Sequence, residues 1–421
     1  MHTLPATEIE LAAWLRLSLA PGLKPAALRL LLQAFGLPEA IFEQTPEALA
    51  AIAGEAAARA ALAPTGADFD TQLDAVMAWR EQSGNQIVTL DDPAYPPALL
   101  TMPDPPPLLY IKGRLNLLHT RAVALVGSRS ATPQGVEDAE RFARELSAAG
   151  VTVVSGLALG IDGAAHRGSL AGIGGTVAVI GTGADLVYPS AHHALARQIA
   201  VQGAIVSEWP LGTPARAANF PQRNRLIAGL VSGVVIVEAA MRSGSLITAR
   251  LANEMGRDIF ALPGSIHAPL SRGCHRIIKQ GAKLVETPDE VLEELGFARR
   301  GAARTVPSSA HAVLWGDADP TIAPEVRGAT AERPKSAAAQ AASASRADSA
   351  IADAPAPPRP PVDPEAERLL SALGHSPTTL EILATRTEME DAALQSTLLQ
   401  LELAGQITAL PGGRFMRASH G

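Results

Sequence analysis

Short runs of four or five apolar residues, separated by stretches with helical spacing, follow one another from Leu108 to Val285. The runs are LLYIKG, AVALVGS, VTVVSG, TVAVIGTG, AIVSEWP, GVVIVEA, DIFALPG and AKLVET. Apolar runs that are not broken by alternating polar residues are typical of parallel strands that helices bury on both faces. The pattern therefore predicts an α/β fold built on a doubly wound parallel sheet, within a domain that we place at residues 85–298.

The pattern before this region predicts helices. From residue 8 to residue 62 the apolar residues have helical spacing, Pro21 and Gly22 turn the chain before a second helix, and Gly36 ends that helix. This order of helices and turns resembles a helix-hairpin-helix or SAM-like module, which we place at residues 1–80. Amides of such a hairpin can hold a DNA phosphate. The segment has few basic residues, which favours a structural or partner-docking role.

Two different patterns follow the sheet region. Residues 299–363 are dominated by Ala, Pro, Ser and Arg, a composition that cannot bury enough apolar surface to offset chain entropy, so we predict a disordered linker there. Residues 364–418 then give helix, turn, helix, turn, a longer helix and two short strands about a Pro-Gly-Gly turn. That order predicts a winged-helix module.

Composition excludes several classes of protein. The chain has 421 residues, which suits two or three domains. Its one cysteine, Cys274, rules out a disulfide framework, and Cys274 with His275 lacks the spaced partners of a zinc site. We find neither a signal peptide nor a run of about 18 apolar residues. We therefore predict a cytoplasmic protein with no membrane insertion, no metal and no cofactor.

The distribution of charge tells more than its sum. The net charge is −7, which alone disfavours a nucleic-acid binder. Residues 105–297, however, contain 18 Lys/Arg and 15 Asp/Glu, a local charge of +3. Between residues 207 and 280 there are nine basic and four acidic residues. The central region is therefore locally basic, as an anion-binding domain would be, although a solvated face would give the same count.

Gly- and Ser-rich loops follow the predicted strands at the points where helices begin. Such loops let the backbone approach a ligand, and the free amides of a helix start attract an anion. Arg129 can add a forked contact to phosphate oxygens, with pairing to a carboxylate as the alternative. The residues that we predict to bind phosphate or DNA are Gly127, Ser128, Arg129, Ser130, Gly156, Gly160, Thr182, Gly183, Phe220, Arg223, Asn224, Arg225, Ser243, Gly244 and Ser245.

Four side chains near these loops have a structural interpretation, and for three of them a contact with a ligand is an alternative. Asp162 is placed to cap the helix that carries His166, and His166 either touches a ligand or is a satisfied, half-buried histidine. Phe220 either stacks on a base beside two arginines or anchors a loop to the sheet. Glu238 ends a strand at the cleft, where holding a loop through hydrogen bonds is favoured over a catalytic role.

Several motifs of catalytic sites are absent. The sequence contains no GxxxxGK[ST], GxSxG or HExxH motif, and GTGADL lacks the third glycine of a dinucleotide fingerprint. Adjacent His192 and His193 point to different sides of a helix, which disfavours a metal pair. Phosphate-binding loops without an evident nucleophile, base or metal indicate binding and not turnover, so we predict that the protein is not an enzyme.

The motifs VGSRS, SGLALGIDGAAH, AVIGTGADLVYP, FPQRNRLIAGL, VVIVEA and SGSLITA, in this order, resemble the DprA/Smf family of DNA-processing proteins over about residues 100–290. The resemblance implies an extended Rossmann fold that binds single-stranded DNA, forms a homodimer, and loads the RecA recombinase on incoming DNA during natural transformation. By position, Gly127, Ser128 and Arg129 match the family's phosphate-binding motif, and residues 220–225 match the segment that lines its DNA pocket.

Two other classes of function are compatible with parts of the pattern. The sheet and its loops also resemble the LOG family of nucleoside-monophosphate phosphoribohydrolases, but MRSGSLITARLANE has Thr248, Ala249 and Arg250 where that family's catalytic carboxylate would follow. A winged-helix transcriptional regulator is the other alternative. Residues 389–405 contain no Lys or Arg, so a recognition helix there would meet the DNA backbone poorly, and a protein contact is favoured.

Overall fold

The central region folds around a nine-stranded sheet in this computed structural model, which describes residues 7–297, 364–373, 378–410 and 414–418. The predicted linker at 299–363 lies outside the described residues. The strands are β1 (Asn85–Thr89), β2 (Leu108–Gly113), β3 (Ala122–Val126), β4 (Thr152–Ser155), β5 (Thr176–Val179), β6 (Ala204–Ser207), β7 (Gly233–Ile236), β8 (Asp258–Ala261) and β9 (Lys283–Leu284). Their spatial order is β1-β2-β6-β5-β4-β3-β7-β8-β9.

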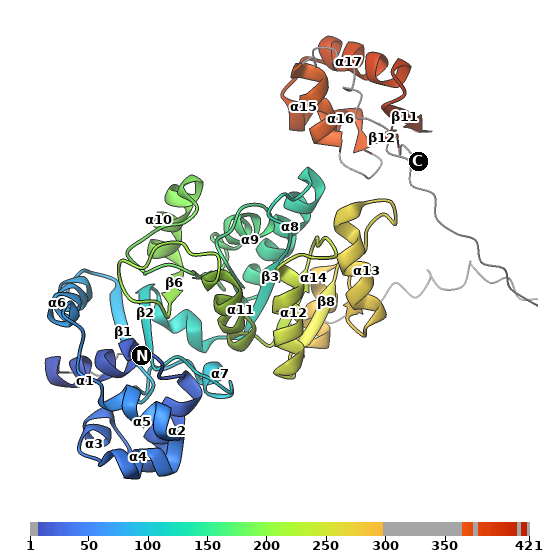
Figure 1. Ribbon diagram of the computed structural model, residues 1–421. Helices are drawn as coiled ribbons and strands as arrows, with labels where there is room; N and C mark the ends of the chain where they lie inside the picture. The colour runs from blue at the N-terminus through green and yellow to red at the C-terminus, as the bar shows by residue number, and fades with distance from the viewer. Residues whose placement is uncertain (1–6, 298–363, 374–377, 411–413, 419–421) are drawn as a thin grey trace, which may run out of the picture. The chain divides into compact units, whose positions relative to one another are not determined.

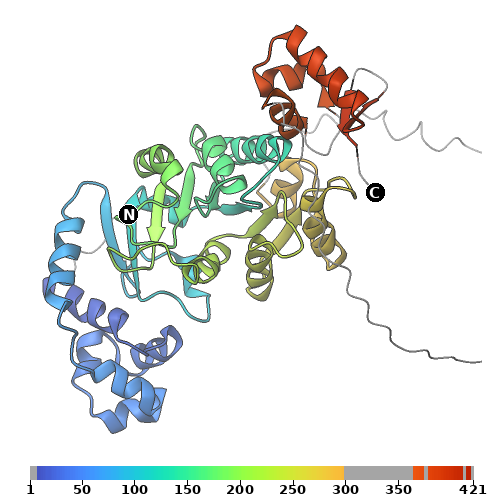
Figure 2. The ribbon, with the colours of Figure 1, turned by 45° about the horizontal axis from the view of Figure 1, so that its top comes forward.

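Helices cover both faces of this sheet, as Figures 1 and 2 show. On one face lie α8, α9, α10 and α14, and on the other α7, α11, α12 and α13. Their bounds are α7 (Pro97–Leu100), α8 (Pro133–Ala148), α9 (Ile161–Ser169), α10 (His193–Gln202), α11 (Asn219–Leu230), α12 (Ser245–Glu254), α13 (Arg272–Lys279) and α14 (Pro288–Glu294). Two helical layers on a mostly parallel sheet confirm the doubly wound α/β fold.

Strand β3 shows why its residues form an unbroken apolar run. Successive side chains of a strand point to opposite faces of the sheet. Val123 and Leu125 pack with Phe142 of α8, whereas Ala124 and Val126 belong to the cluster on the other face. All of them are buried, so neither face leaves room for a polar side chain.

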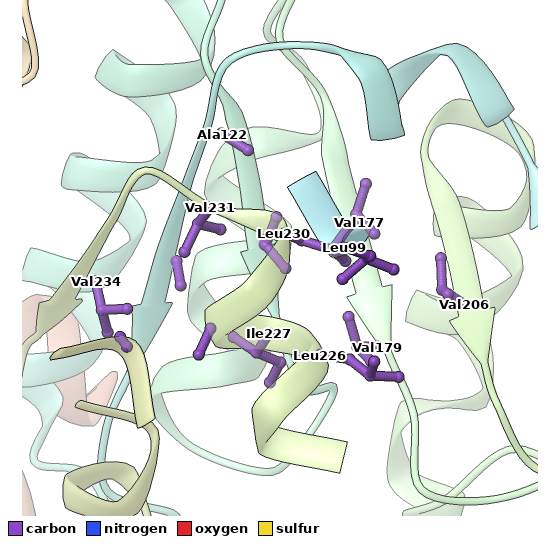
Figure 3. Close-up of a cluster of buried hydrophobic side chains, with 14 of the residues drawn as sticks. Leu99, Ala122, Val177, Val179, Val206, Leu226, Ile227, Leu230, Val231 and Val234 are labelled. Atoms are coloured by element: carbon purple, nitrogen blue, oxygen red, sulfur yellow. The ribbon is translucent and has the colours of Figure 1, made fainter. Parts of the chain in front are cut away.

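Helix α11 provides much of the second layer. In Figure 3, Leu226, Ile227 and Leu230 of this helix point toward Val177 and Val179 of the sheet. Each of these side chains is almost completely buried. The apolar half of α11 therefore fixes the helix on the sheet, and its first turn reaches past the carboxyl ends of the strands.

The prediction that all of these strands are parallel was wrong for one of them. LLYIKG forms β2, which pairs antiparallel with β6 and with β1, a strand from Asn85 to Thr89 that we did not predict. The first four residues of β2 are buried, like those of the parallel strands. A strand covered on both faces has the same apolar run whichever way it points, so the pattern carried no sign of direction.

The chain changes direction across the sheet beside β3. From β3 it passes through β4 and β5 to β6 on one side, and β7, β8 and β9 then build the other side. Strands β3 and β7 are parallel neighbours, with Val123 opposite Gly233 and Val126 opposite Ile236. Doubly wound sheets bind ligands at such a switch point, outside the carboxyl ends of the strands.

The N-terminal region is helical, as predicted. Its helices are α1 (Glu8–Leu19), α2 (Pro25–Phe35), α3 (Pro38–Phe42), α4 (Pro46–Ala53), α5 (Glu55–Leu62) and α6 (Phe69–Arg80). Helix α2 ends at Gly36, whose positive φ of 89° suits glycine. Leu11, Trp14 and Trp79 form one hydrophobic cluster with Leu108 and Tyr110 of β2. These helices and the edge of the sheet therefore share a core.

The C-terminal module has the predicted order of elements. It contains α15 (Pro364–Leu373), α16 (Leu380–Thr387), α17 (Asp391–Leu403), β11 (Ile407–Leu410) and β12 (Arg414–Arg417), with a short additional strand β10 (Thr378–Thr379). The strands form a three-stranded antiparallel sheet in the order β10-β12-β11. Leu369, Leu383, Leu394 and Leu398 are buried in its own hydrophobic core. This arrangement is a winged helix.

Cys274 is buried on α13, where its thiol lies 3.7 Å from the carbonyl oxygen of Val237. Burial raises the pKa of this thiol to about 12, so it is protonated at neutral pH and unreactive as a nucleophile.

Within the described ranges, none of the helices combines the length and the apolar character needed to cross a bilayer.

Candidate nucleic-acid interface

A cavity of about 740 Å³ opens beside the carboxyl ends of β3 and β7, at the switch point of the sheet. The loops after these two strands and the first turns of α11 and α12 form its walls. The predicted residues that line it are Gly127, Ser128, Arg129, Ser130, Phe220, Arg223, Asn224, Ser243, Gly244 and Ser245. Segments about 100 residues apart in the sequence thus meet at one site.

Arg129 lies exposed at the rim of this cavity. The structure gives it no ion pair and no hydrogen bond to any residue it describes, so pairing with a carboxylate, the alternative considered above, is not observed. Its guanidinium carbon lies 5.3 Å from the centre of the Phe220 ring, a cation–π contact. The donors of Arg129 therefore remain available to an anionic ligand.

Phe220 is held between several groups at the start of α11. The ring of Tyr188 lies 5.5 Å from it at 40°, and Gly181 lies behind it, where an added Cβ would come within 3.2 Å of the Phe220 ring. The Asn219 side-chain amide donates a 2.9 Å hydrogen bond to the carbonyl oxygen of Gly181 and fixes this end of the helix. Tyr188 is 49% exposed. Two aromatic rings and one arginine thus form a single surface at the cavity.

Arg223 supplies a buried positive charge at the cavity. It is only 3% exposed, and its Nη1 donates a 2.8 Å hydrogen bond to the carbonyl oxygen of Val179. Its Nε is buried and has no hydrogen-bond partner among the residues that the structure describes. Burial lowers the pKa of Arg223 to about 10, so the guanidinium is still charged at neutral pH. A fixed cation with an unsatisfied donor is suited to attracting an anion.

Gly156 makes room for that arginine. A Cβ at this position would lie 1.6 Å from Arg223 Nη1, so only glycine allows the guanidinium to occupy its place. Gly156 itself does not line the cavity. Its role is to position Arg223 and not to contact a ligand.

Gly160 supports the cavity in a similar way. Its φ is +72°, and an added Cβ would lie 2.2 Å from the carbonyl oxygen of Ser128. The next amide, of Ile161, donates a 3.1 Å hydrogen bond to that same oxygen. The turn after β4 therefore packs directly behind the VGSRS loop and holds its shape, while Gly160 stays outside the cavity.

Three further predicted residues do not line the cavity. The Thr182 hydroxyl donates to the carbonyl oxygen of Leu186, and the Gly183 amide donates to that of Thr213, so hydrogen bonds within the loop and to the segment after β6 hold the GTGAD loop. Arg225 forms an ion pair with Glu208 in a different cavity. Its guanidinium is therefore engaged away from the loops of the site.

Ser243, Gly244 and Ser245 form the other wall. The two hydroxyl oxygens are 2.7 Å apart, and the Ser245 amide donates a 3.3 Å hydrogen bond to Ser243 Oγ. The Asn224 amide donates to the carbonyl oxygen of Gly244 and ties this wall to α11. The first residues of α12 line the cavity, so the positive end of this helix lies at this wall.

Asp162 is not the helix cap that we expected. Helix α9 begins after Gly160, and Asp162 lies in its first turn, where Oδ2 accepts a 3.4 Å hydrogen bond from the Ala158 amide. The turn before α9 needs a residue with positive φ, and Gly160 adopts it at +72°. Gly160 is therefore the N-cap residue, two positions before Asp162. Asp162 lines the cavity. Burial raises the pKa of its carboxyl, and the charge of Arg223 opposes that effect.

His166 is a satisfied core histidine and lies outside the cavity. The Leu157 amide donates to its Nε2 at 3.2 Å, and its Nδ1 is 2.8 Å from Thr176 Oγ1, whose own proton goes to the carbonyl oxygen of Val153. These contacts require a neutral ring with the proton on Nδ1. Burial accordingly lowers the pKa of His166 to about 3.

His192 acts together with His166 on one strained residue. Leu157 has a positive φ of 59°, which is unfavourable for a side chain of this kind. His192 Nδ1 donates a 2.9 Å hydrogen bond to its carbonyl oxygen, while His166 accepts from its amide. Two buried histidines thus hold the turn that supports the site.

In the part of the chain that the structure describes, no three His, Cys, Asp or Glu side chains lie close enough together to hold a metal ion.

Glu238 holds a loop, as the sequence favoured. Its two carboxylate oxygens accept hydrogen bonds from the Thr132 amide at 2.9 Å and the Thr132 hydroxyl at 2.6 Å. Thr132 in turn caps α8 by accepting from the Gly135 amide. Burial raises the pKa of Glu238. The carboxyl does not line the cavity, so it is not placed to act on a ligand there.

The sequence analysis assigned Thr248 to an anion-accepting helix start, and Thr248 does line the cavity, but it missed two residues that could contact a ligand, Tyr188 and Arg242. Tyr188 follows the GTGAD loop directly before a proline, and its aromatic character in a Gly-rich loop was a usable signal. Arg242 precedes the serines of the α12 wall and is exposed. Neither could be assigned to the cavity before the loops after β5 and β7 were known to converge.

The chain matches known families over its sheet domain and its C-terminal module. The family model for DNA recombination-mediator protein A matches residues 86–296, and the DprA winged helix domain matches residues 353–413. Protein Smf of Escherichia coli is 39% identical over 356 residues, which cover 83% of this chain and 82% of that protein. Protein Smf of Synechocystis sp. is 34% identical over 418 residues, which cover 97% of this chain and 99% of that protein.

A solved structure agrees with these matches. The X-ray structure of DNA processing protein A (DprA) from Streptococcus pneumoniae has a TM-score of 0.58 to this chain at 38% identity, and the alignment covers 69% of this chain and 99% of that chain. Sequence motifs, sheet topology and winged helix thus lead to the same assignment. The chain belongs to the DprA/Smf family of DNA-processing proteins.

Proposed function

We propose that the cavity at the switch point binds single-stranded DNA through its sugar–phosphate backbone. The observation that carries this proposal is the exposed guanidinium of Arg129, which no described carboxylate engages and which lies beside the Phe220 and Tyr188 rings. Aromatic rings for bases beside cations for phosphates are the combination that proteins use for single strands. Membership of a family described as recombination mediators supports DNA as the ligand.

We propose binding without catalysis at this site. A phosphoribohydrolase would need a carboxylate free to act on its substrate, and Glu238 is instead occupied by Thr132. Asp162 lines the cavity, but it is 7% exposed and lies beside the charge of Arg223. Release of adenine from AMP by the purified protein would contradict this part of the proposal.

The partners that the family resemblance implies belong to the same proposal. We infer that the protein forms a homodimer through its Rossmann domain and loads the RecA recombinase on bound single strands during natural transformation. The family description as a recombination mediator supports the part of this inference that concerns a recombinase.

Replacing Arg129 by alanine tests the DNA site. Loss of a charge-assisted hydrogen bond costs about 1.5–3 kcal/mol, which is roughly a ten- to 150-fold rise in Kd. Since the contact is to phosphate, the loss should be similar on two unrelated oligonucleotides, and the slope of log K against log salt should fall by about 0.7. The Arg129→Lys variant should recover only part of the affinity, because an ammonium cannot fork.

The control is Arg197→Ala, which removes an exposed arginine of α10 that lies outside the cavity. It should leave both the affinity and the salt slope within about twofold of wild type. Arg129→Ala protein that is folded and binds with wild-type affinity would mean that the VGSRS loop is a structural turn only.

A further inference from the structure

A second cavity of about 720 Å³ adjoins the first on the side of α12 and α13. Its walls come from the outer face of α12, from β8 and from the residues between Arg276 and Lys283. Arg242, Ser243 and Ile247 line both cavities. The two cavities therefore adjoin at the start of α12.

The second cavity is strongly basic. Five cationic side chains line it, Arg242, Arg250, Arg257, Arg276 and Lys283, against the two acidic side chains of Asp258 and Glu294. Its formal charge of five minus two, or +3, stands in a chain whose net charge is −7. Charge of one sign gathered in a concave surface raises the local concentration of an oppositely charged ligand.

The five cations differ in what they already contact. Lys283 is paired with Glu294, and Arg257 Nη2 donates a 3.0 Å hydrogen bond to Thr101 Oγ1, so both have structural partners. Arg250 has only a 3.5 Å pair with Glu254, and both of these side chains are more than half exposed. Such pairs contribute little to stability.

Arg242 and Arg276 are exposed, and the structure gives neither of them a hydrogen bond or ion pair with a residue that it describes. Neither arginine therefore has a role in holding the described fold together. Arg242 stands at the junction of the cavities, and Arg276 stands on the far wall. Free cations at both ends of the second cavity are suited to successive phosphates of one chain.

We propose that the second cavity continues the DNA site, so that a strand bound at Arg129 passes Arg242 and lays its next phosphates against Arg250 and Arg276. This inference rests on the proposed function of the first cavity. The recognised ligand is a polyanionic sugar–phosphate backbone and not a base, because the lining offers several cations and no exposed aromatic ring pair. Binding should therefore depend on strand length.

The test compares a short oligonucleotide of about 5 thymidines, which fills the first cavity only, with one of about 20 thymidines that can span both. The variants are Arg129→Ala and the double variant Arg250→Ala/Arg276→Ala. The charge-matched control is Arg144→Ala/Arg197→Ala, which removes two exposed arginines that line neither cavity. Kd and its salt slope are measured by fluorescence anisotropy on the full chain.

The double variant should bind the short strand within about twofold of wild type and the long strand at least about tenfold more weakly, with a salt slope reduced by about 1.4. Arg129→Ala should weaken both lengths. Unchanged long-strand binding in the double variant, or an equal loss at both lengths, would overturn the inference while leaving the first site intact. Wild-type binding by Arg129→Ala would instead remove the proposed function.

Oligomeric state is measured on the same samples by mass photometry. A change of mass in the double variant, without a length-dependent loss of affinity, would assign the second cavity to contact between copies of the chain and overturn the DNA path. An unchanged mass together with the length-dependent loss supports it.

Discussion

Phe220 is the residue at which stacking and anchoring can be separated by experiment. Its ring contacts both Arg129 and Tyr188 and is half-buried at the cavity, so part of the side chain is accessible to a ligand. We expect Phe220→Ala to cost about 1–3 kcal/mol in binding of single strands. The salt slope should stay unchanged, since no phosphate contact is lost. Salt titration on two oligonucleotides measures both quantities.

Phe220→Tyr is the matched variant, because it keeps the ring and should keep most of the affinity. Equal affinity of Phe220→Ala and wild type would mean that the ring only anchors α11 against Gly181. A flattened salt slope in Phe220→Ala would instead mean that the substitution displaces Arg129, whose guanidinium rests on this ring.

Gly156 and Gly244 offer a second pair of variants at the residue scale. An alanine Cβ at 156 would meet Arg223 Nη1 at 1.6 Å, whereas at Gly244 it would meet no atom within 4 Å. Overpacking of this kind costs about 1–3 kcal/mol, so we expect Gly156→Ala to lower the free energy of unfolding by that amount and to weaken DNA binding by displacing Arg223. Gly244→Ala should be close to wild type in urea unfolding, because the added Cβ has open space around it.

Residue-level predictions from the sequence succeeded where the loop itself determines a side chain's position. Arg129 follows β3 directly, so its place at the carboxyl end of the sheet could be expected from the VGSRS pattern. Arg223 and Arg225 were treated as equivalent, but both lie on α11, where residues two apart point to nearly opposite sides. Arg223 therefore reaches the cavity while Arg225 reaches Glu208. Periodicity alone did not show where that helix begins.

The elements of the sheet could be predicted better than their pairing. Each apolar run between Leu108 and Val285 became a strand. The central strands are buried on both faces, as the unbroken runs indicated, whereas Asp258 at the start of β8 and both residues of β9 are exposed. The direction of β2 and the existence of β1 depend on partners that are far away in sequence, and NQIVT carries too weak a pattern to reveal them. The convergence of the cavity walls follows from strand order, which a linear pattern does not contain.

Helix α9 carries the residue that should give the fold a pH dependence. The folded pKa of His166 is lowered to about 3, whereas an unfolded histidine titrates near 6.5. The unfolded state therefore binds the proton first, and stability falls as the pH drops below about 6.5, by about 1.4 kcal/mol per pH unit. The side chain of a His166→Gln variant does not titrate, so the variant does not lose stability in this way at low pH. The difference in free energy of unfolding between wild type and the variant should therefore shrink between about pH 6.5 and pH 5.

Comparison with the variant is needed because the raised pKa values of Glu208, which reaches about 7, and of Glu238 change the stability in the opposite direction as the pH falls. These carboxyls are present in both proteins, so their contributions cancel in the difference. Urea unfolding at a series of pH values measures it. Parallel stability curves for the two proteins would show that His166 does not titrate as its burial implies.

At the scale of the whole molecule, the charge distribution separates the DNA site from the C-terminal module. All residues of both cavities lie between positions 126 and 294, in the region that carries the local positive charge. Helix α17 of the winged helix contains no Lys or Arg, so it would contact the phosphate backbone poorly. We interpret this module as a surface for a protein partner.

Truncation tests that separation. We expect a protein of residues 1–297 to bind single strands with the Kd and salt slope of the full chain within about threefold, because every residue of the cavities is retained.

A protein of residues 85–297 keeps the cavities as well, but it loses Leu11, Trp14 and Trp79, which cover Leu108 and Tyr110 of β2. We therefore expect it to have a lower Tm and to aggregate on heating, since an apolar surface of the sheet is exposed. Thermal unfolding and anisotropy on both proteins distinguish the two losses. A large rise in Kd for residues 1–297 with an unchanged Tm would place part of the DNA contact in the winged helix and contradict the electrostatic argument.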